Sequence, residues 1–176
     1  PERFEKEIAN INAMPSETLK ELIESGQYVP SYMWNQNGWL CSKMNLHVIS
    51  QTQKCYPTAH SEDLFSTTLN TTIKAGDPTG MRAIVTTETE EGITFVTECV
   101  GKVFAPDEFD RNDWTFIGEP ETTVSVNQPA TVEMTCATIV NRIPQLIDAP
   151  AGYVTTDKYP YNEYCVHDLN TYVKTK

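Results

Sequence analysis

The sequence predicts an α+β fold, with a mixed, largely antiparallel sheet of five or more strands and helices packed on one face. Three observations support this prediction. Apolar residues recur at helical spacing near the N-terminus, the middle of the chain is rich in Thr and β-branched residues, and a further helical pattern begins at residue 135. Because helices and strands are segregated rather than alternating, this class is favoured over a parallel doubly wound fold.

Two short helices are expected at the start of the chain. Apolar residues recur at helical spacing over residues 4–14, and a second such pattern runs from Leu19 to Gly26. A glycine at that point can end a helix in the left-handed conformation. The stretch Tyr28–Trp39 is interpreted as an irregular connection followed by a turn at residues 35–38.

Strands are expected in the middle of the chain, beginning at residues 46–53 and 65–73. A hairpin is the clearest local pattern, because Met81–Glu88 and Ile93–Val100 flank a short polar link that contains Gly92. Further strand patterns lie at residues 114–117, 123–126 and 130–134.

A longer helix is expected next, since apolar residues fall on one helical face from Thr135 to Ile147. Pro144 is expected to kink or restart this helix. The segments predict a helical part over residues 1–30, an α+β domain over 31–161, and a C-terminal tail over 162–176.

The chain is acidic. Thirteen Lys and Arg oppose 24 Asp and Glu among 176 residues, which gives a formal net charge of -11 at pH 7. Nucleic acid and anionic membranes are therefore excluded as partners. No apolar run reaches the roughly 18 residues of a membrane span. The charged start of the chain is unlike a signal peptide, so a cytoplasmic location, or a chain already processed, is expected.

Several kinds of site lack their sequence motifs. Five widely spaced cysteines without a CxxC pair predict free thiols. The three histidines are dispersed and Cys165-Val166-His167 has no second ligand pair, so no metal site is expected. The eight glycines form neither GxGxxG nor GxxxxGKS/T, and this chain alone is expected to bind no dinucleotide. Without a nucleophile motif the catalytic residues are unassigned.

One candidate substrate contact lies on the first predicted strand. Gln51 and Gln53 point to one face of this strand, and Ser50 and Thr52 point to the other. One pair faces the core and the other faces outward. Polar strand surface without a ligand is the alternative interpretation.

Two further candidates lie in a helix and in a loop. Arg142, next to Asn141, has a guanidinium group that can hold a carboxylate through two parallel bonds; a surface position or a pair with Asp148 is the alternative. Lys74 and Asp77 lie in a loop with flanking glycines, where functional groups are often displayed; a solvated turn is the alternative.

Several motifs resemble one family. The matching segments are Gly80–Arg82, Glu98–Val103, Asn112–Trp114, Gly118–Thr122, Cys136–Pro144 and Ala149–Thr155. The most specific piece is the helix with Asn141, Ile143 and Pro144, followed by the turn Pro150–Gly152. Over residues 40 to 161 the chain resembles the second domain of dihydrodipicolinate-reductase-like dehydrogenases, of the 2,4-diaminopentanoate dehydrogenase kind.

The resemblance implies an N-terminal Rossmann domain that binds NAD or NADP, present in cis or in trans. The domain seen here would then shape the pocket for a small amino-acid-like substrate and make homo-oligomer contacts. Hydride would pass between nicotinamide and the carbon that bears an amine or imine. Thr71 and Thr72 stand where the reductases carry two histidines, which argues against dihydrodipicolinate itself.

Three functions stay open. The leading one is the substrate-binding and oligomerisation domain of an NAD(P)-dependent oxidoreductase acting on an amino acid or imine. The second is a non-catalytic, β-rich ligand-binding module. The third is a structural protein that self-associates through its sheet.

Overall fold

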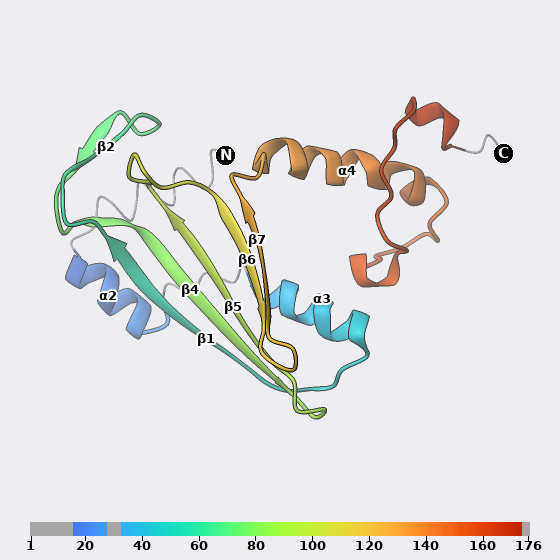
Figure 1. Ribbon diagram of the computed structural model, residues 1–176, viewed down its shortest axis with the longest axis horizontal. Helices are drawn as coiled ribbons and strands as arrows, with labels where there is room; N and C mark the ends of the chain where they lie inside the picture. The colour runs from blue at the N-terminus through green and yellow to red at the C-terminus, as the bar shows by residue number, and fades with distance from the viewer. Residues whose placement is uncertain (1–15, 28–32, 174–176) are drawn as a thin grey trace. The chain divides into compact units, whose positions relative to one another are not determined.

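The computed structural model describes residues 16–27 and 33–173, and the chain divides into two compact units, residues 1–106 and 107–176 (Figure 1). Every strand pair in the described residues is antiparallel, and helices accompany the sheets, so the α+β class is confirmed. The strands form three sheets, of three, two and two strands, rather than one sheet of five or more. The helix expected over residues 4–14 lies outside the described residues.

Helix α2 (Ser16–Glu24) forms where the second helical pattern predicts it. Its Leu19 is completely buried and packs against Met81, with the partly buried Cys55 beside them. Gly26 follows the helix at a φ of 71°, which confirms the predicted left-handed end. This apolar cluster fixes α2 on the sheet.

Helix α3 (Trp34–Met44) begins within the segment expected to be an irregular connection and a turn, so that prediction is wrong over residues 34–39. Residues 28–32 of the same segment lie outside the described residues. Asn35, Asn37 and Gly38 have low helix propensity and favour turns. A tertiary contact overrides this preference, because the fully buried side chain of Asn37 is hydrogen-bonded to the sheet. Asn45 ends the helix in the left-handed region.

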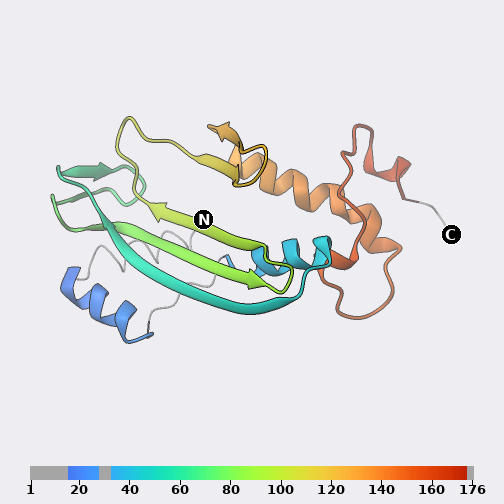
Figure 2. The same cartoon turned by 60° about the horizontal axis from the view of Figure 1, so that its bottom comes forward.

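The largest sheet has the order β1-β4-β5, formed by β1 (Val48–Ala59), β4 (Pro78–Thr89) and β5 (Thr94–Lys102). The three strands run side by side with β4 in the middle (Figure 2). The predicted hairpin is confirmed as β4–β5, and Gly92 in its turn has a φ of 80°. Side chains of β4 alternate between the two faces, and the face that packs on α2 and α3 is buried.

A small ladder of β2 (Leu64–Ser66) and β3 (Thr71–Ile73) replaces the single strand expected over residues 65–73. A turn separates the two strands, and its Asn70 has a φ of 49°. Asn tolerates this conformation better than most residues, which explains the reversal within a Thr-rich run.

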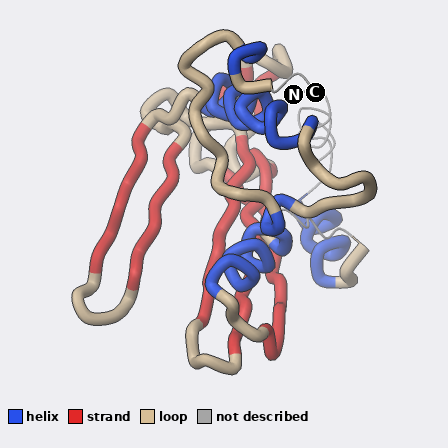
Figure 3. The backbone as a smooth tube through the Cα atoms, turned by 90° about the vertical axis from the view of Figure 1, so that its right-hand side faces the viewer, coloured by secondary structure: helices blue, strands red, loops and turns tan. Residues whose placement is uncertain are grey.

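The second unit begins with the hairpin β6 (Arg111–Phe116) and β7 (Thr122–Asn127), two strands joined by one loop (Figure 3). Helix α4 (Thr131–Ile147) follows. The strand expected over residues 130–134 is wrong, because these residues lead into and form the first turn of α4, where Glu133 favours the helix N-terminus electrostatically.

Helix α4 continues through Pro144 without a restart, and none of its residues is buried. After α4 comes the short 3-10 turn η1 (Thr156–Lys158), and the described part of the C-terminal tail contains a second one, η2 (Leu169–Thr171). Apolar side chains of α4 and of the hairpin therefore remain exposed in the described residues, among them Val132, Ile139 and Phe116.

Candidate functional site

Gln51 and Gln53 lie on the buried side of β1, below the first turn of α3. The indole N–H of Trp34 donates a hydrogen bond to Oε1 of Gln53, and Nε2 of Gln51 donates one to the carbonyl of Trp34 at 3.3 Å. The other pair faces outward, where Ser50 donates to Glu88 at 2.8 Å. Gln51 and Gln53 thus form a neutral, partly buried amide pair beside an indole.

A second set of polar groups lies deeper under α3. Nδ2 of Asn37 donates to Oγ1 of Thr87 at 3.0 Å, and Oγ1 of Thr97 donates to Oδ1 of Asn37 at 2.9 Å. Asn37 and Thr87 are both completely buried. The sequence pattern alone does not indicate this network, since Thr on a strand is also what β propensity alone produces.

Lys74 and Asp77 lie in an exposed loop that is fixed by a residue the sequence analysis did not single out. Nζ of Lys74 is 2.7 Å from Oδ2 of Asp63, and Oδ1 of Asp63 accepts the N–H of Ala75 at 2.9 Å. These bonds lower the pKa of Asp63, and hydrogen bonding to Asp63 raises the pKa of Lys74. The backbone N–H of Asp77 donates to the carbonyl of Lys74 at 3.0 Å.

Asn141 and Arg142 lie on α4 and hold the segment after it. Nη1 of Arg142 donates to the carbonyl of Pro160 at 2.8 Å and to the side chain of Gln145, and its guanidinium lies over the ring of Tyr159, 5.5 Å from the centroid. Oδ1 of Asn141 accepts the N–H of Cys165 at 3.0 Å. These two side chains therefore position the chain that follows α4.

The candidate residues thus occur as three local pairs, one under α3, one in the loop before β4 and one on α4. No group of three metal-ligating side chains occurs in residues 16–27 and 33–173. No helix within those ranges is long and apolar enough to cross a membrane. The five cysteines carry free thiols.

The connection from β7 into α4 differs from a phosphate-binding turn. Phosphate binding in Rossmann folds needs a glycine-rich turn from a strand into a helix. Here β7 leads into α4 through residues 128–130, which contain no glycine, and Glu133 in the first turn of α4 adds a negative charge.

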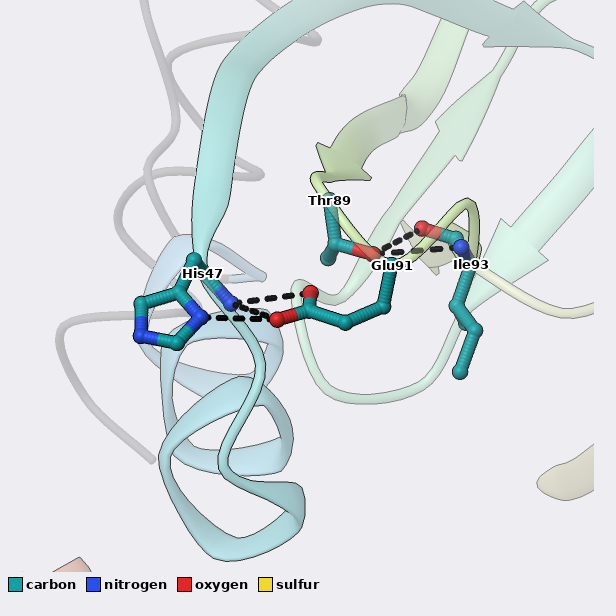
Figure 4. Close-up of polar contacts among 4 residues, drawn as sticks. All are labelled: His47, Thr89, Glu91 and Ile93. Atoms are coloured by element: carbon teal, nitrogen blue, oxygen red, sulfur yellow. Dashed lines mark hydrogen bonds and ion pairs between the residues drawn. The ribbon is translucent and has the colours of Figure 1, made fainter.

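His47 joins the start of β1 to the turn between β4 and β5 (Figure 4). Its Nδ1 is 2.7 Å from Oε1 of Glu91, and its backbone N–H donates to Oε2 of Glu91 at 3.0 Å. Thr89 closes the same turn by bonding to Ile93. The hydrogen bond with Glu91 raises the pKa of His47, and the same contact lowers the pKa of Glu91.

The His47–Glu91 pair is expected to stabilise the fold most between about pH 4.5 and pH 6.5. The pKa of His47 is higher in the folded than in the unfolded protein. Its stabilising effect is therefore complete below the pKa that His47 has in the unfolded chain, and it is lost as the pH rises through the pKa that His47 has in the folded protein. The pKa of Glu91 is lower in the folded than in the unfolded protein, so its stabilising effect is lost as the pH falls through the pKa that Glu91 has in the folded protein. Thermal unfolding of His47→Gln should therefore show a larger loss of melting temperature at pH 5.5 than at pH 8.5. An equal loss at both values would contradict this coupling.

A similarity to known proteins is found among solved structures. No protein-family model and no curated protein matches the chain. The chain resembles an amine dehydrogenase. One similar solved structure is that of the amine dehydrogenase from Mycobacterium smegmatis, with a TM-score of 0.78 and 35% sequence identity over 86% of this chain and 45% of that chain.

The amine dehydrogenase match supports a dehydrogenase-related fold. It extends over most of the present chain, but the chain spans less than half the length of the amine dehydrogenase. The activity, substrate and partners of the longer protein are therefore proposals for this chain.

Proposed function

We propose that this chain is the substrate-binding and self-associating part of an NAD(P)-dependent oxidoreductase that acts on an amine, an amino acid or the corresponding imine. The match with an amine dehydrogenase at 35% identity and a TM-score of 0.78 is the observation that carries the proposal. The finer assignment, to dihydrodipicolinate-reductase-like dehydrogenases of the 2,4-diaminopentanoate kind, rests on motifs between residues 80 and 155.

In this proposal a Rossmann domain, in cis or in trans, supplies NAD or NADP. Apolar side chains on α4 are exposed: Val132 is 68% exposed, Ile139 64% and Leu146 54%. Their exposure favours a second domain that covers this helix. A lone helix is marginally stable in water, and its stability in proteins comes mostly from packing an apolar face. The free thiols support a reducing, cytoplasmic compartment.

The substrate contacts in this proposal are polar groups rather than a metal. The amides under α3 offer neutral donors and acceptors, and the lysine and arginine offer positive charge to a carboxylate. The catalytic acid or base is not assigned. The proposed contacts are Arg142, Asn141, Lys74, Asp77, Gln51 and Gln53.

Reconstitution tests the proposed function. The chain is mixed with the part of the amine dehydrogenase that lies outside the matched region, and reduction of NAD or NADP is followed with amines and amino acids. We expect reduction only when both polypeptides and an amine or amino acid are present. Failure of a mixture that binds the cofactor to reduce it with any such substrate would contradict the proposal.

The isolated chain is expected to show no appreciable affinity for NADH or NADPH in a calorimetric titration. The reasons are the absence of glycine from the turn into α4 and the net charge of -11, which repels a pyrophosphate. Micromolar binding would reject the assignment of the cofactor to another domain.

Arg142→Lys is expected to raise the Michaelis constant for an amino-acid substrate by roughly tenfold, since lysine keeps the charge but loses the planar fork. The contacts of Arg142 with Pro160 and Gln145 engage Nη1, and a guanidinium has five donors. Kinetics and thermal unfolding of the reconstituted enzyme are compared. If the kinetics were unchanged and the melting temperature lowered, Arg142 would hold the segment after α4 and would not bind substrate.

A further inference from the structure

The loop between β3 and β4, residues 74–77, offers one backbone N–H to a carboxylate. The N–H groups of Gly76 and Asp77 donate to backbone carbonyls, at 2.9 and 3.0 Å. The N–H of Ala75 instead donates to Oδ1 of Asp63 at 2.9 Å. Gly76 has a φ of 84°, a conformation that glycine adopts without strain, so this tight turn is a stable arrangement of the loop.

Lys74 supplies a second donor to the same carboxylate. Its Nζ lies 2.7 Å from Oδ2 of Asp63, so an ammonium and a backbone N–H hold the two oxygens of one side chain. Two such donors side by side also suit the carboxylate of a small molecule. The side chain of Lys74 is 69% exposed and that of Asp63 48%, so a carboxylate from solution can reach both donors.

The fold holds Asp63 at this position. Leu64 of β2 pairs with Ile73 of β3, and Asp63 and Lys74 directly adjoin this pair. Leu64 and Ile73 are both buried, and they anchor the two strands from which Asp63 and Lys74 extend. Because Asp63 is tethered beside the loop, it competes with a free carboxylate at a high effective concentration.

The charge around these donors is negative. Three carboxylates and one ammonium lie in the two segments that meet here, so their formal charge is -2. The residues are Glu62, Asp63, Asp77 and Lys74. A site of this sign attracts an ammonium group and repels a further carboxylate.

We propose that Asp63 determines the class of substrate, because it occupies the carboxylate position of the 74–77 loop and so favours amines without a carboxylate over amino acids. An amino acid must displace Asp63 from Lys74 and Ala75 before its own carboxylate can bind there, whereas an amine binds without this step. The proposal rests on the proposed function, in which Lys74 is one of the substrate contacts.

Binding of butyrate to the full chain tests the occupancy of this position without cofactor, partner domain or turnover. In Asp63→Ala the two donors lose their internal carboxylate, so sodium butyrate should bind about tenfold more tightly than it binds the wild type. The amide signal of Ala75 is followed by NMR in the isotope-labelled chain, against sodium chloride at the same concentration. Asp63→Ala/Lys74→Met should lose the gained affinity, because the ammonium is gone.

Glu62→Ala is the matched control. It makes the same change in net charge at the neighbouring residue, but the exposed Glu62 is not the carboxylate that Lys74 and Ala75 hold. Butyrate should bind this variant as it binds the wild type. Equal affinity for butyrate in the wild type and Asp63→Ala, or an equal gain in Glu62→Ala, would overturn the proposal.

The reconstituted enzyme tests the effect on substrate choice, with norvaline and butylamine as a pair that differs only in the carboxylate. Asp63→Ala should raise the ratio of kcat/KM for norvaline to that for butylamine about tenfold, mainly through a lower KM for norvaline. An unchanged ratio in an enzyme that turns over both compounds would overturn the proposal. Absence of turnover in the wild type and in every variant would instead contradict the proposed function, and the butyrate titration would still decide whether Asp63 fills the carboxylate position.

Discussion

Gly80→Ala is expected to lower the free energy of unfolding by about 3 kcal/mol, at the upper end of the usual cost of overpacking. A Cβ at this position would lie 2.1 Å from the carbonyl oxygen of Gly101 and 2.5 Å from Cα of Lys102. Both are backbone atoms of β5, so relief requires the strands to separate. Gly80 pairs with Lys102 in the β4–β5 ladder, and that separation would weaken the main sheet.

Denaturant unfolding measures this cost, and Gly38→Ala provides the control. Gly38 lies within α3, where an added Cβ meets nothing within 4 Å. Alanine there should raise the free energy of unfolding by up to about 1 kcal/mol through helix propensity. If Gly80→Ala were as stable as the wild type, the close approach of β4 and β5 at this point would be wrong.

The strands were more predictable from the sequence than the helices. Alternating polar and β-branched residues around Gly92 specify a hairpin locally, and β4–β5 forms there. Thr131 and Val132 are β-branched and therefore predict a strand, although they form the first turn of α4. Helix α3 was missed because the stabilising contacts of Asn37 come from residues 50 and 60 positions away, which a local pattern cannot contain.

The candidate site shows the same limit. Alternation along a strand correctly separated Gln51 and Gln53 from Ser50, and the two pairs do point to different faces. The partners of Arg142 were not predictable, because the carbonyl that it binds belongs to Pro160, 18 residues later in a segment without periodicity. Substrate binding by Arg142 stays a prediction, which the kinetics of Arg142→Lys test.

Asn37→Ala is the second large effect and is expected to lower the free energy of unfolding by about 2–4 kcal/mol. The change deletes both hydrogen bonds to the sheet, at 3.0 Å to Thr87 and 2.9 Å from Thr97, and opens a cavity at a completely buried position. It also leaves the buried hydroxyl of Thr87 without the amide that now donates to it. The gain in helix propensity, below about 1 kcal/mol, is too small to compensate.

A variant that removes every partner separates hydrogen bonding from packing. In Asn37→Leu/Thr87→Val/Thr97→Val no hydroxyl of this network is left unpaired, and replacing all partners by apolar groups of similar shape can be nearly neutral. We therefore expect the triple variant to be more stable than Asn37→Leu alone in denaturant unfolding. A triple variant less stable than the single one would mean that the two threonines stabilise the sheet independently of Asn37. If the triple variant recovers the stability that Asn37→Leu loses, burial of the sheet-facing side chains is what stabilises α3. The amide of Asn37 then determines which residue of this weakly helical segment faces the sheet.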